Sequence, residues 1–195
     1  MVSPSTSDHA ATRGLADAFG LLGLTPKFDV DADTLEKAFF ERSKELHADR
    51  FATAPAAERV VALTRSRALN DAYQLLKKPA ARAEYLLAGE GLTIGDNERI
   101  DPALVMDLLE EREELAGQRQ AGNLVRVEQL QSAMRARRKA AFEKIKGLFA
   151  TLGEERGAEG RGDRAAQIAE IKGQLILLRY VERYLEECDA ALDED

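Results

Sequence analysis

The stretch Leu46-His47-Ala48-Asp49-Arg50-Phe51 is a short polar break between two segments with helical periodicity. In the segment before it, Asp33 can cap the first turn, with Glu36 three residues on. The apolar stripe of that segment is Leu35, Phe39 and Leu46. After the break, Pro55 fits the first turn of another helix, whose predicted inward face is Val60, Val61, Thr64, Ala68, Ala72 and Leu75. The sequence therefore predicts a helical hairpin with the break at its tip.

Short helices are expected on both sides of this hairpin. Residues 15–22 carry apolar side chains at helical spacing, whereas residues 1–13 show no periodicity and are expected to be disordered. Beyond the hairpin, Pro79 restarts the helix, and residues 80–88 form a further short one. We therefore predict one helical unit over residues 14–91.

The rest of the chain carries long apolar stripes. After a polar linker at 92–101, Asp101 and Pro102 supply a cap and a first-turn proline. Apolar residues then recur in threes and fours over three segments, at about 103–119, 123–152 and 164–192. Such stripes are typical of helices packed side by side, so we predict an antiparallel three-helix bundle over residues 102–195 and an all-α fold class.

Composition narrows the possible functions. The formal net charge of −7 argues against a nucleic-acid partner, because phosphate binding needs a clustered basic surface. The single cysteine, Cys188, excludes an intrachain disulfide and a multi-cysteine zinc site, and we expect it to be a packed structural thiol. No apolar run is long enough to cross a bilayer and no signal-peptide layout is present, so we predict a cytoplasmic protein without a membrane partner.

No constellation for catalysis stands out in the sequence. There is no nucleophile–base pair and no phosphate-cradling glycine loop. His47 and Asp49 have no further metal ligand close by in the sequence. We therefore expect neither an enzyme nor a bound metal or cofactor.

The first helix of the bundle has more apolar surface than its packing needs. A buried stripe requires only Leu104, Leu108 and Leu115. Round the side of the helix lie Val105, Met106, Leu109, Glu110 and Glu113. Surplus apolar area edged with carboxylates is typical of a protein-binding patch. The alternative is that Val105 and Leu109 belong to a wide core face.

The second bundle helix carries a basic run, which consists of Arg135, Arg137, Arg138 and Lys139. We interpret it as a solvated face of a long helix in acidic surroundings. Contact with an acidic partner is one alternative, and RNA binding is a weaker one because of the net charge.

Three blocks of the sequence together resemble the HscB-type J-domain co-chaperones of iron–sulfur cluster assembly. The first is the His-x-Asp tripeptide at 47–49. The second runs from Asn70 to Leu87, and the third runs from Leu104 to Leu115. The order and spacing of the blocks carry the resemblance, since the tripeptide alone would be weak.

The resemblance implies a J-domain that docks on a heat-shock-type ATPase chaperone (HscA-like) and stimulates its ATP hydrolysis. That role would fall to His47 and Asp49, with Lys44 and Arg50 as the docking charges nearest the loop. It also implies that the bundle binds and delivers the cluster scaffold protein (IscU-like). The matching scaffold-binding positions are Val105, Met106, Leu109, Glu110, Glu113 and Tyr180.

The sequence departs from the J-domain pattern at Ala48, where the family has proline. Alanine leaves the loop backbone less restricted, at a cost of about 0.4–1 kcal/mol if the geometry is unchanged. Two alternatives therefore stay open: a degenerate J-like adaptor that binds partners without stimulating an ATPase, and a structural helical protein whose bundle forms a homodimer. At the loop, the alternative for His47 and Asp49 is a solvated helix end beside a turn, which would be preferred if the tripeptide stood without the other two blocks.

Overall fold

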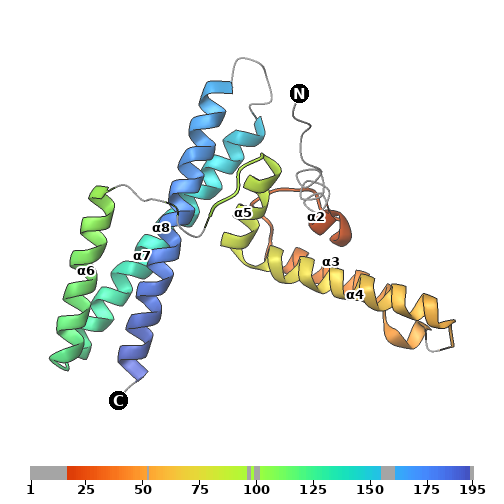
Figure 1. Ribbon diagram of the computed structural model, residues 1–195, viewed down its shortest axis with the longest axis horizontal. Helices are drawn as coiled ribbons and strands as arrows, with labels where there is room; N and C mark the ends of the chain where they lie inside the picture. Colours follow the sequence, from red (N-terminus) through yellow and green to blue (C-terminus); the bar gives the residue numbers. More distant parts are fainter. Residues whose placement is uncertain (1–16, 52, 96–97, 99–101, 155–160, 194–195) are drawn as a thin grey trace, which may run out of the picture. The chain divides into compact units, whose positions relative to one another are not determined.

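The structure, a computed structural model, describes residues 17–51, 53–95, 98, 102–154 and 161–193. All regular structure in these ranges is helical, which confirms the predicted all-α class (Figure 1). The chain divides into two compact units between Thr93 and Ile94. The segment 1–13, which we expected to be disordered, lies outside the described residues.

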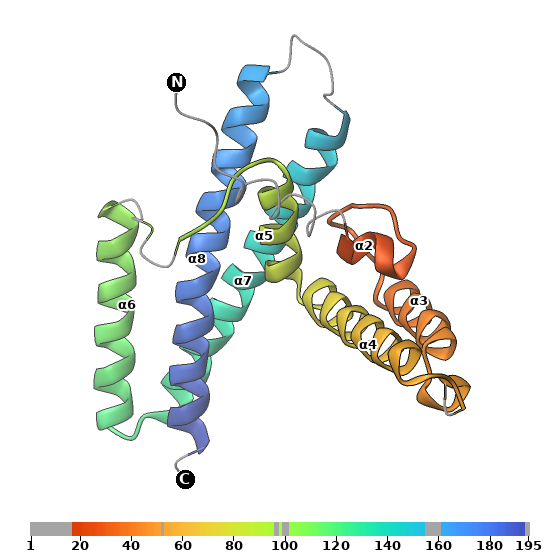
Figure 2. The same cartoon turned by 45° about the vertical axis from the view of Figure 1, so that its right-hand side comes forward.

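The first unit is built around the predicted hairpin. Its elements are α2 (Asp17–Leu22), α3 (Ala32–Glu45), the 3-10 helix η1 (Ala48–Phe51), α4 (Ala56–Lys77) and α5 (Pro79–Gly89). Helices α3 and α4 lie side by side and antiparallel, with η1 between their ends (Figure 2). Buried side chains of α2, α3 and α4 form the core, namely Ala18, Phe19, Leu22, Leu35, Leu69, Ala72 and Leu76. The core thus lies away from the loop and leaves the hairpin tip uncovered.

The start of α3 differs from the prediction. Asp31, and not Asp33, is the cap: its carboxylate accepts hydrogen bonds from the backbone N–H and the hydroxyl of Thr34, each at 2.9 Å. These hydrogen bonds lower the pKa of Asp31, because they favour the charged form. Asp33 lies inside the first turn.

The inward face of α4 also differs from the prediction. Val60 and Val61 were expected to be buried, but 63% and 50% of their surface is exposed, and Thr64 is exposed as well. The buried positions of the helix are Ala62, Leu69, Ala72 and Leu76. The valines are exposed because the amino-terminal part of α4 extends beyond the core of the unit.

A buried arginine joins α5 to the rest of the first unit. Nε of Arg82 donates to the carbonyl oxygen of Phe28 at 2.8 Å, and Nη1 donates to that of Leu76 at 2.5 Å. Burial lowers the pKa of Arg82, but arginine keeps its charge in proteins. One side chain therefore satisfies two backbone acceptors from distant parts of the unit.

Replacing Arg82 with methionine is expected to destabilise the first unit by about 2–5 kcal/mol, because two buried acceptors lose their donor. Denaturant unfolding of the full chain measures the effect. Arg59→Met, at an exposed position of α4, serves as the control. An Arg82→Met variant as stable as this control would contradict the role given to the side chain.

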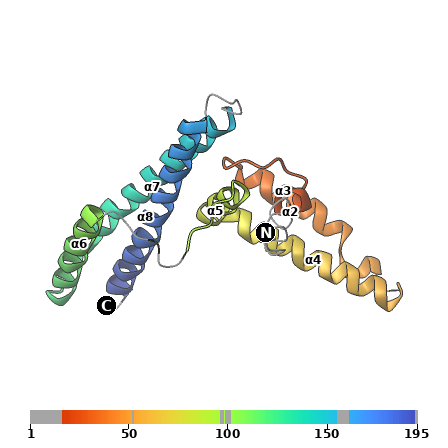
Figure 3. The ribbon, with the colours of Figure 1, turned by 45° about the horizontal axis from the view of Figure 1, so that its top comes forward.

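The second unit contains α6 (Pro102–Gln120), α7 (Leu124–Glu154) and α8 (Arg161–Asp193). Helix α7 runs antiparallel to α6 and α8 (Figure 3). Most of the described buried side chains come from α7 and α8, among them Val127, Met134, Ile145, Ile171, Leu175, Val181 and Cys188. Burial raises the pKa of the Cys188 thiol to about 11, so it stays protonated at neutral pH, in keeping with the expected packed thiol.

The basic run of α7 does more than face solvent. Arg137 Nη1 lies 3.0 Å from a carboxylate oxygen of Glu111, and Arg138 Nε lies 2.8 Å from Glu182 Oε1. Arg135 Nη2 approaches Asp189 Oδ1 at 3.6 Å. The arginines thus counter carboxylates of α6 and α8 while Arg135 and Arg138 stay exposed, in agreement with a solvated stretch in acidic surroundings.

Candidate functional site: a hairpin loop and an apolar patch

The loop at the hairpin tip turns tightly into η1. The N–H of Arg50 donates to the carbonyl oxygen of His47 at 3.0 Å. The side chains of His47 and Arg50 are exposed. Those of Ala48 and Asp49 lie outside the described part of the chain. The tip therefore presents an imidazole and a guanidinium to solvent at the end of a rigid hairpin.

Lys44 is exposed on the last turn of α3, as expected for a docking charge. Its Nζ lies 2.8 Å from Glu41 Oε1 and 4.3 Å from the centroid of the Phe40 ring. An exposed ion pair of this kind contributes at most about 1 kcal/mol, so a stronger acidic partner can displace it. The Phe40 ring beside Lys44 is itself 58% exposed.

A shallow apolar pocket of about 330 Å³ lies beside the loop. It is lined by Leu46, Phe51, Ala57, Glu58, Val61, Ala62 and Arg65. The sequence analysis missed this surface because it assigned Val61 to the core. The apolar residues of α4 lie on two faces of the helix. The face with Ala62, Leu69 and Leu76 is buried, whereas the face with Val60 and Leu63 is exposed.

The position of Ala48 is compatible with proline. Ala48 is the first residue of η1, where the N–H has no partner within the helix. His47, the residue before it, lies outside helical structure, as a residue before proline prefers. The backbone at this point therefore does not explain why the chain lacks the proline.

Ala48→Pro is accordingly expected to keep the fold and to stabilise the first unit by about 0.4–1 kcal/mol, because the unfolded chain loses freedom. Denaturant unfolding against wild type measures this change. Destabilisation by more than about 1 kcal/mol would show that the loop cannot accept the ring.

The second surface is the apolar patch predicted on the first bundle helix. Met106 and Leu109 of α6 are 57% and 49% exposed, and Tyr180 of α8 is 39% exposed. Val105 is half-buried, whereas Glu110 and Glu113 are exposed. The exposure of Leu109 speaks against its place in a wide core face, whereas the half-buried Val105 leaves that alternative open for its own position. Leu108 and Leu115 are buried as expected, and the side chain of Leu104 is not among those described.

Contacts between α6 and α8 show at which level of α6 Tyr180 lies. The Tyr184 hydroxyl donates to the carbonyl oxygen of Glu111, 73 residues earlier, and Arg112 pairs with Glu187, 75 residues later. Since α6 and α8 run in the same direction, these separations place Tyr180 level with residues 105–107. The structure thus brings Met106 and Tyr180 to the same height of the bundle.

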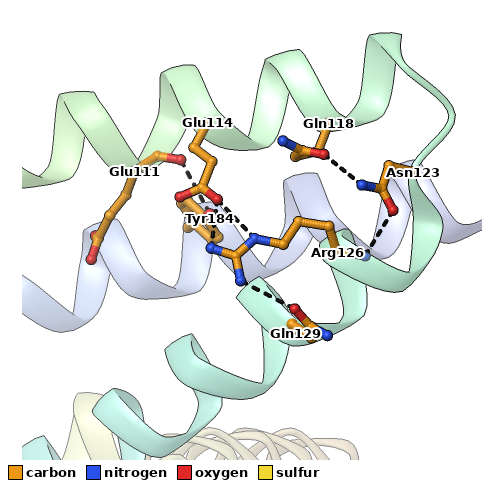
Figure 4. A network of polar contacts seen from close by, with 7 residues as sticks. All are labelled: Glu111, Glu114, Gln118, Asn123, Arg126, Gln129 and Tyr184. Atoms are coloured by element: carbon orange, nitrogen blue, oxygen red, sulfur yellow. Dashed lines mark hydrogen bonds and ion pairs between the residues drawn. The ribbon is translucent and has the colours of Figure 1, made fainter.

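Polar contacts hold α6 against its neighbours (Figure 4). Nε and Nη2 of Arg126 donate to Glu114 Oε1 at 2.8 and 2.6 Å. Arg137 Nη1 lies 3.0 Å from each carboxylate oxygen of Glu111. Burial raises the pKa of Tyr184 well above its ordinary value, so its hydroxyl remains a donor to the Glu111 carbonyl oxygen at 3.2 Å. Sequence reasoning missed this network, because its partners come from different helices.

Other kinds of site are absent from the described residues. No group of three or more His, Cys, Asp or Glu side chains among them could hold a metal ion. No helix in the described part of the chain is long and apolar enough to span a membrane.

Comparisons with known proteins agree with this arrangement. The family described as HSCB C-terminal oligomerisation domain matches residues 100–189. A co-chaperone protein HscB homolog of Vibrio vulnificus strain YJ016 is 46% identical over 99 residues, which are 50% of this chain and 58% of that protein. The chain thus matches little more than half the length of this relative.

A second relative matches almost end to end. The co-chaperone protein HscB homolog of Ralstonia nicotianae is 34% identical over 178 residues, which cover 90% of this chain and 96% of the relative. Among solved structures, chaperone HscB from Vibrio cholerae gives a TM-score of 0.68 at 28% identity, covering 91% of this chain and 98% of that chain.

The human co-chaperone protein HscB shares the fold. It gives a TM-score of 0.74 at 23% identity, covering 89% of this chain and 81% of that chain. Together with the near-complete match to the Ralstonia relative, the helical hairpin and the bundle lead to one conclusion: this chain belongs to the HscB co-chaperone family.

Proposed function

We propose that the chain is a co-chaperone of iron–sulfur cluster assembly that binds two partners through its two units. The first unit docks on an HscA-like ATPase chaperone and stimulates its ATP hydrolysis. The second unit binds the IscU-like scaffold protein. The observation that carries the proposal is that a family member exposes two chemically different surfaces, one on each unit: a loop with His47, and an apolar patch with Met106.

The hairpin tip suits a role as a trigger. A loop held between two packed helices loses little conformational freedom on binding. The free energy gained from its contacts with the chaperone is therefore not cancelled by an entropy cost of ordering the loop. Arg50 and Lys44 are both exposed near His47, which favours an acidic docking surface on the chaperone. In this proposal, His47 and Asp49 enter a polar network of the chaperone, as the family resemblance implies.

The patch suits a protein partner. Exposed Met106, Leu109 and Tyr180 supply the apolar centre, and Glu110 and Glu113 supply a charged edge. Holding both partners on one chain raises the concentration of each near the other. Delivery of the scaffold to the chaperone then needs no chemistry on this chain.

Steady-state ATP hydrolysis by the HscA-like chaperone, with scaffold present, tests the proposal as this protein is titrated in. We expect a saturable increase in the hydrolysis rate. No increase, combined with intact binding of the scaffold, would favour the adaptor without ATPase stimulation. Ala48 in place of proline is the observation that favours that second candidate.

A further inference from the structure

Helix α6 carries the apolar patch but is held by few buried apolar side chains. Among its described side chains, only Leu108 and Leu115 are buried. They lie two turns apart on one face, and apolar contact has no preferred direction. The short connection 121–123 ties the end of α6 to the start of α7, but two leucines leave the rotation and tilt of α6 about that end unfixed.

Ion pairs with α7 fix the orientation of α6, which the two leucines leave free. We define the α6 clasp as the Arg126–Glu114 and Arg137–Glu111 pairs. Arg126 uses two of its nitrogens on one glutamate oxygen, and Arg137 contacts both oxygens of the other glutamate. Charged hydrogen bonds of this geometry are orientation-specific. Rotating α6 about its axis or tilting it away from α7 would break both pairs.

We propose that Arg126 and Arg137 are positioning residues for scaffold binding, because their pairs with α6 act together with the contacts of Tyr184 and Arg112 to keep Met106 level with Tyr180. This inference rests on the proposed binding of the scaffold by the patch. The two arginines need not touch the scaffold: both are engaged with α6, and they act through its position.

The test compares two double variants with the same loss of charge. Arg126→Gln/Arg137→Gln removes the α6 clasp. Arg138→Gln/Lys144→Gln removes two ion pairs between α7 and α8, in which Arg138 Nε lies 2.8 Å from Glu182 and Lys144 Nζ lies 2.6 Å from Glu170. Affinity for the purified IscU-like scaffold and amide hydrogen exchange of α6 are measured for both, along with thermal stability.

The clasp variant is expected to bind the scaffold about fivefold more weakly and to exchange its α6 amides faster. The control variant keeps both properties at wild-type values. A chain with Glu114→Arg and Arg126→Glu forms this pair again with the charges exchanged. Its affinity for the scaffold is expected to lie near the wild-type value, which a loss of general stability in the clasp variant would not explain. Equal weakening in both double variants would overturn the inference, as would no weakening in either.

Failure of the proposed function gives a different result. If wild type does not bind the scaffold at all, the proposed function of the patch is wrong. In that case, amide hydrogen exchange still tests whether Arg126 and Arg137 hold α6 in position. Unchanged exchange of α6 in the clasp variant would show that the arginines do not position the helix.

Discussion

Met106→Ser/Leu109→Ser is expected to weaken scaffold binding about 30- to 150-fold, the equivalent of about 2–3 kcal/mol. Met106 and Leu109 are 57% and 49% exposed, and they form the centre of the apolar patch. Truncating two central apolar contacts of an interface removes most of what such a small patch contributes. Isothermal titration calorimetry with the purified scaffold measures the change.

The same substitutions should leave the fold intact, because exposed positions contribute within about 0.5 kcal/mol to stability. Val125→Ser is the matched control, since Val125 is 66% exposed on α7 of the same unit and lies outside the patch. Loss of affinity in both variants would point to a general effect of removing exposed apolar area. Unchanged affinity in the patch variant would mean that the scaffold binds elsewhere.

The second large effect is expected at the hairpin tip. His47→Gln should lower the maximal stimulation of the chaperone's ATP hydrolysis about tenfold or more, because the loss of one partner in a desolvated polar network costs about 1–3 kcal/mol. His47 is exposed in the free protein, so its replacement should not change the unfolding free energy. Steady-state ATPase titrations report the maximal rate and the half-saturating concentration separately.

Thr53→Ala, an exposed neighbour of the loop, is the control and should stimulate like wild type. A lower half-saturating concentration or an unchanged maximal rate with His47→Gln would mean that residues other than His47 stimulate ATP hydrolysis. If wild type and both variants are equally inactive but still bind the scaffold, the adaptor is favoured, and Ala48→Pro becomes the variant to test.

Much of the fold could be predicted from local sequence signals. Apolar periodicity located the three bundle helices, and each end that the structure gives is within three residues of the prediction. Pro79 correctly marked the start of α5. The cap of α3 was misplaced because three aspartates at positions 29, 31 and 33 compete there. Thr34, three residues after Asp31, was the signal that distinguishes them.

Other features depended on packing that periodicity does not report. Val60 and Val61 belong to an apolar pattern, yet the exposed end of α4 has no core to receive them. The pairs of Arg126 with Glu114 and of Arg137 with Glu111 span 12 and 26 residues, so they form only once α6 and α7 have a defined register. The sequence could place the exposed patch on α6, but it could not show how α6 is held.

Binding of both partners by one chain is the central claim, and a mixing experiment tests it most directly. Lys44→Gln/His47→Gln/Arg50→Gln removes the exposed docking side chains of the first unit and retains the patch. Met106→Ser/Leu109→Ser retains the loop. Recruitment of labelled scaffold to the immobilised HscA-like chaperone is measured with wild type, with each variant, and with an equimolar mixture of the two. Tethering predicts recruitment by wild type and none by the mixture. Recruitment by the mixture equal to wild type would contradict the account, since the two surfaces would then work on separate molecules.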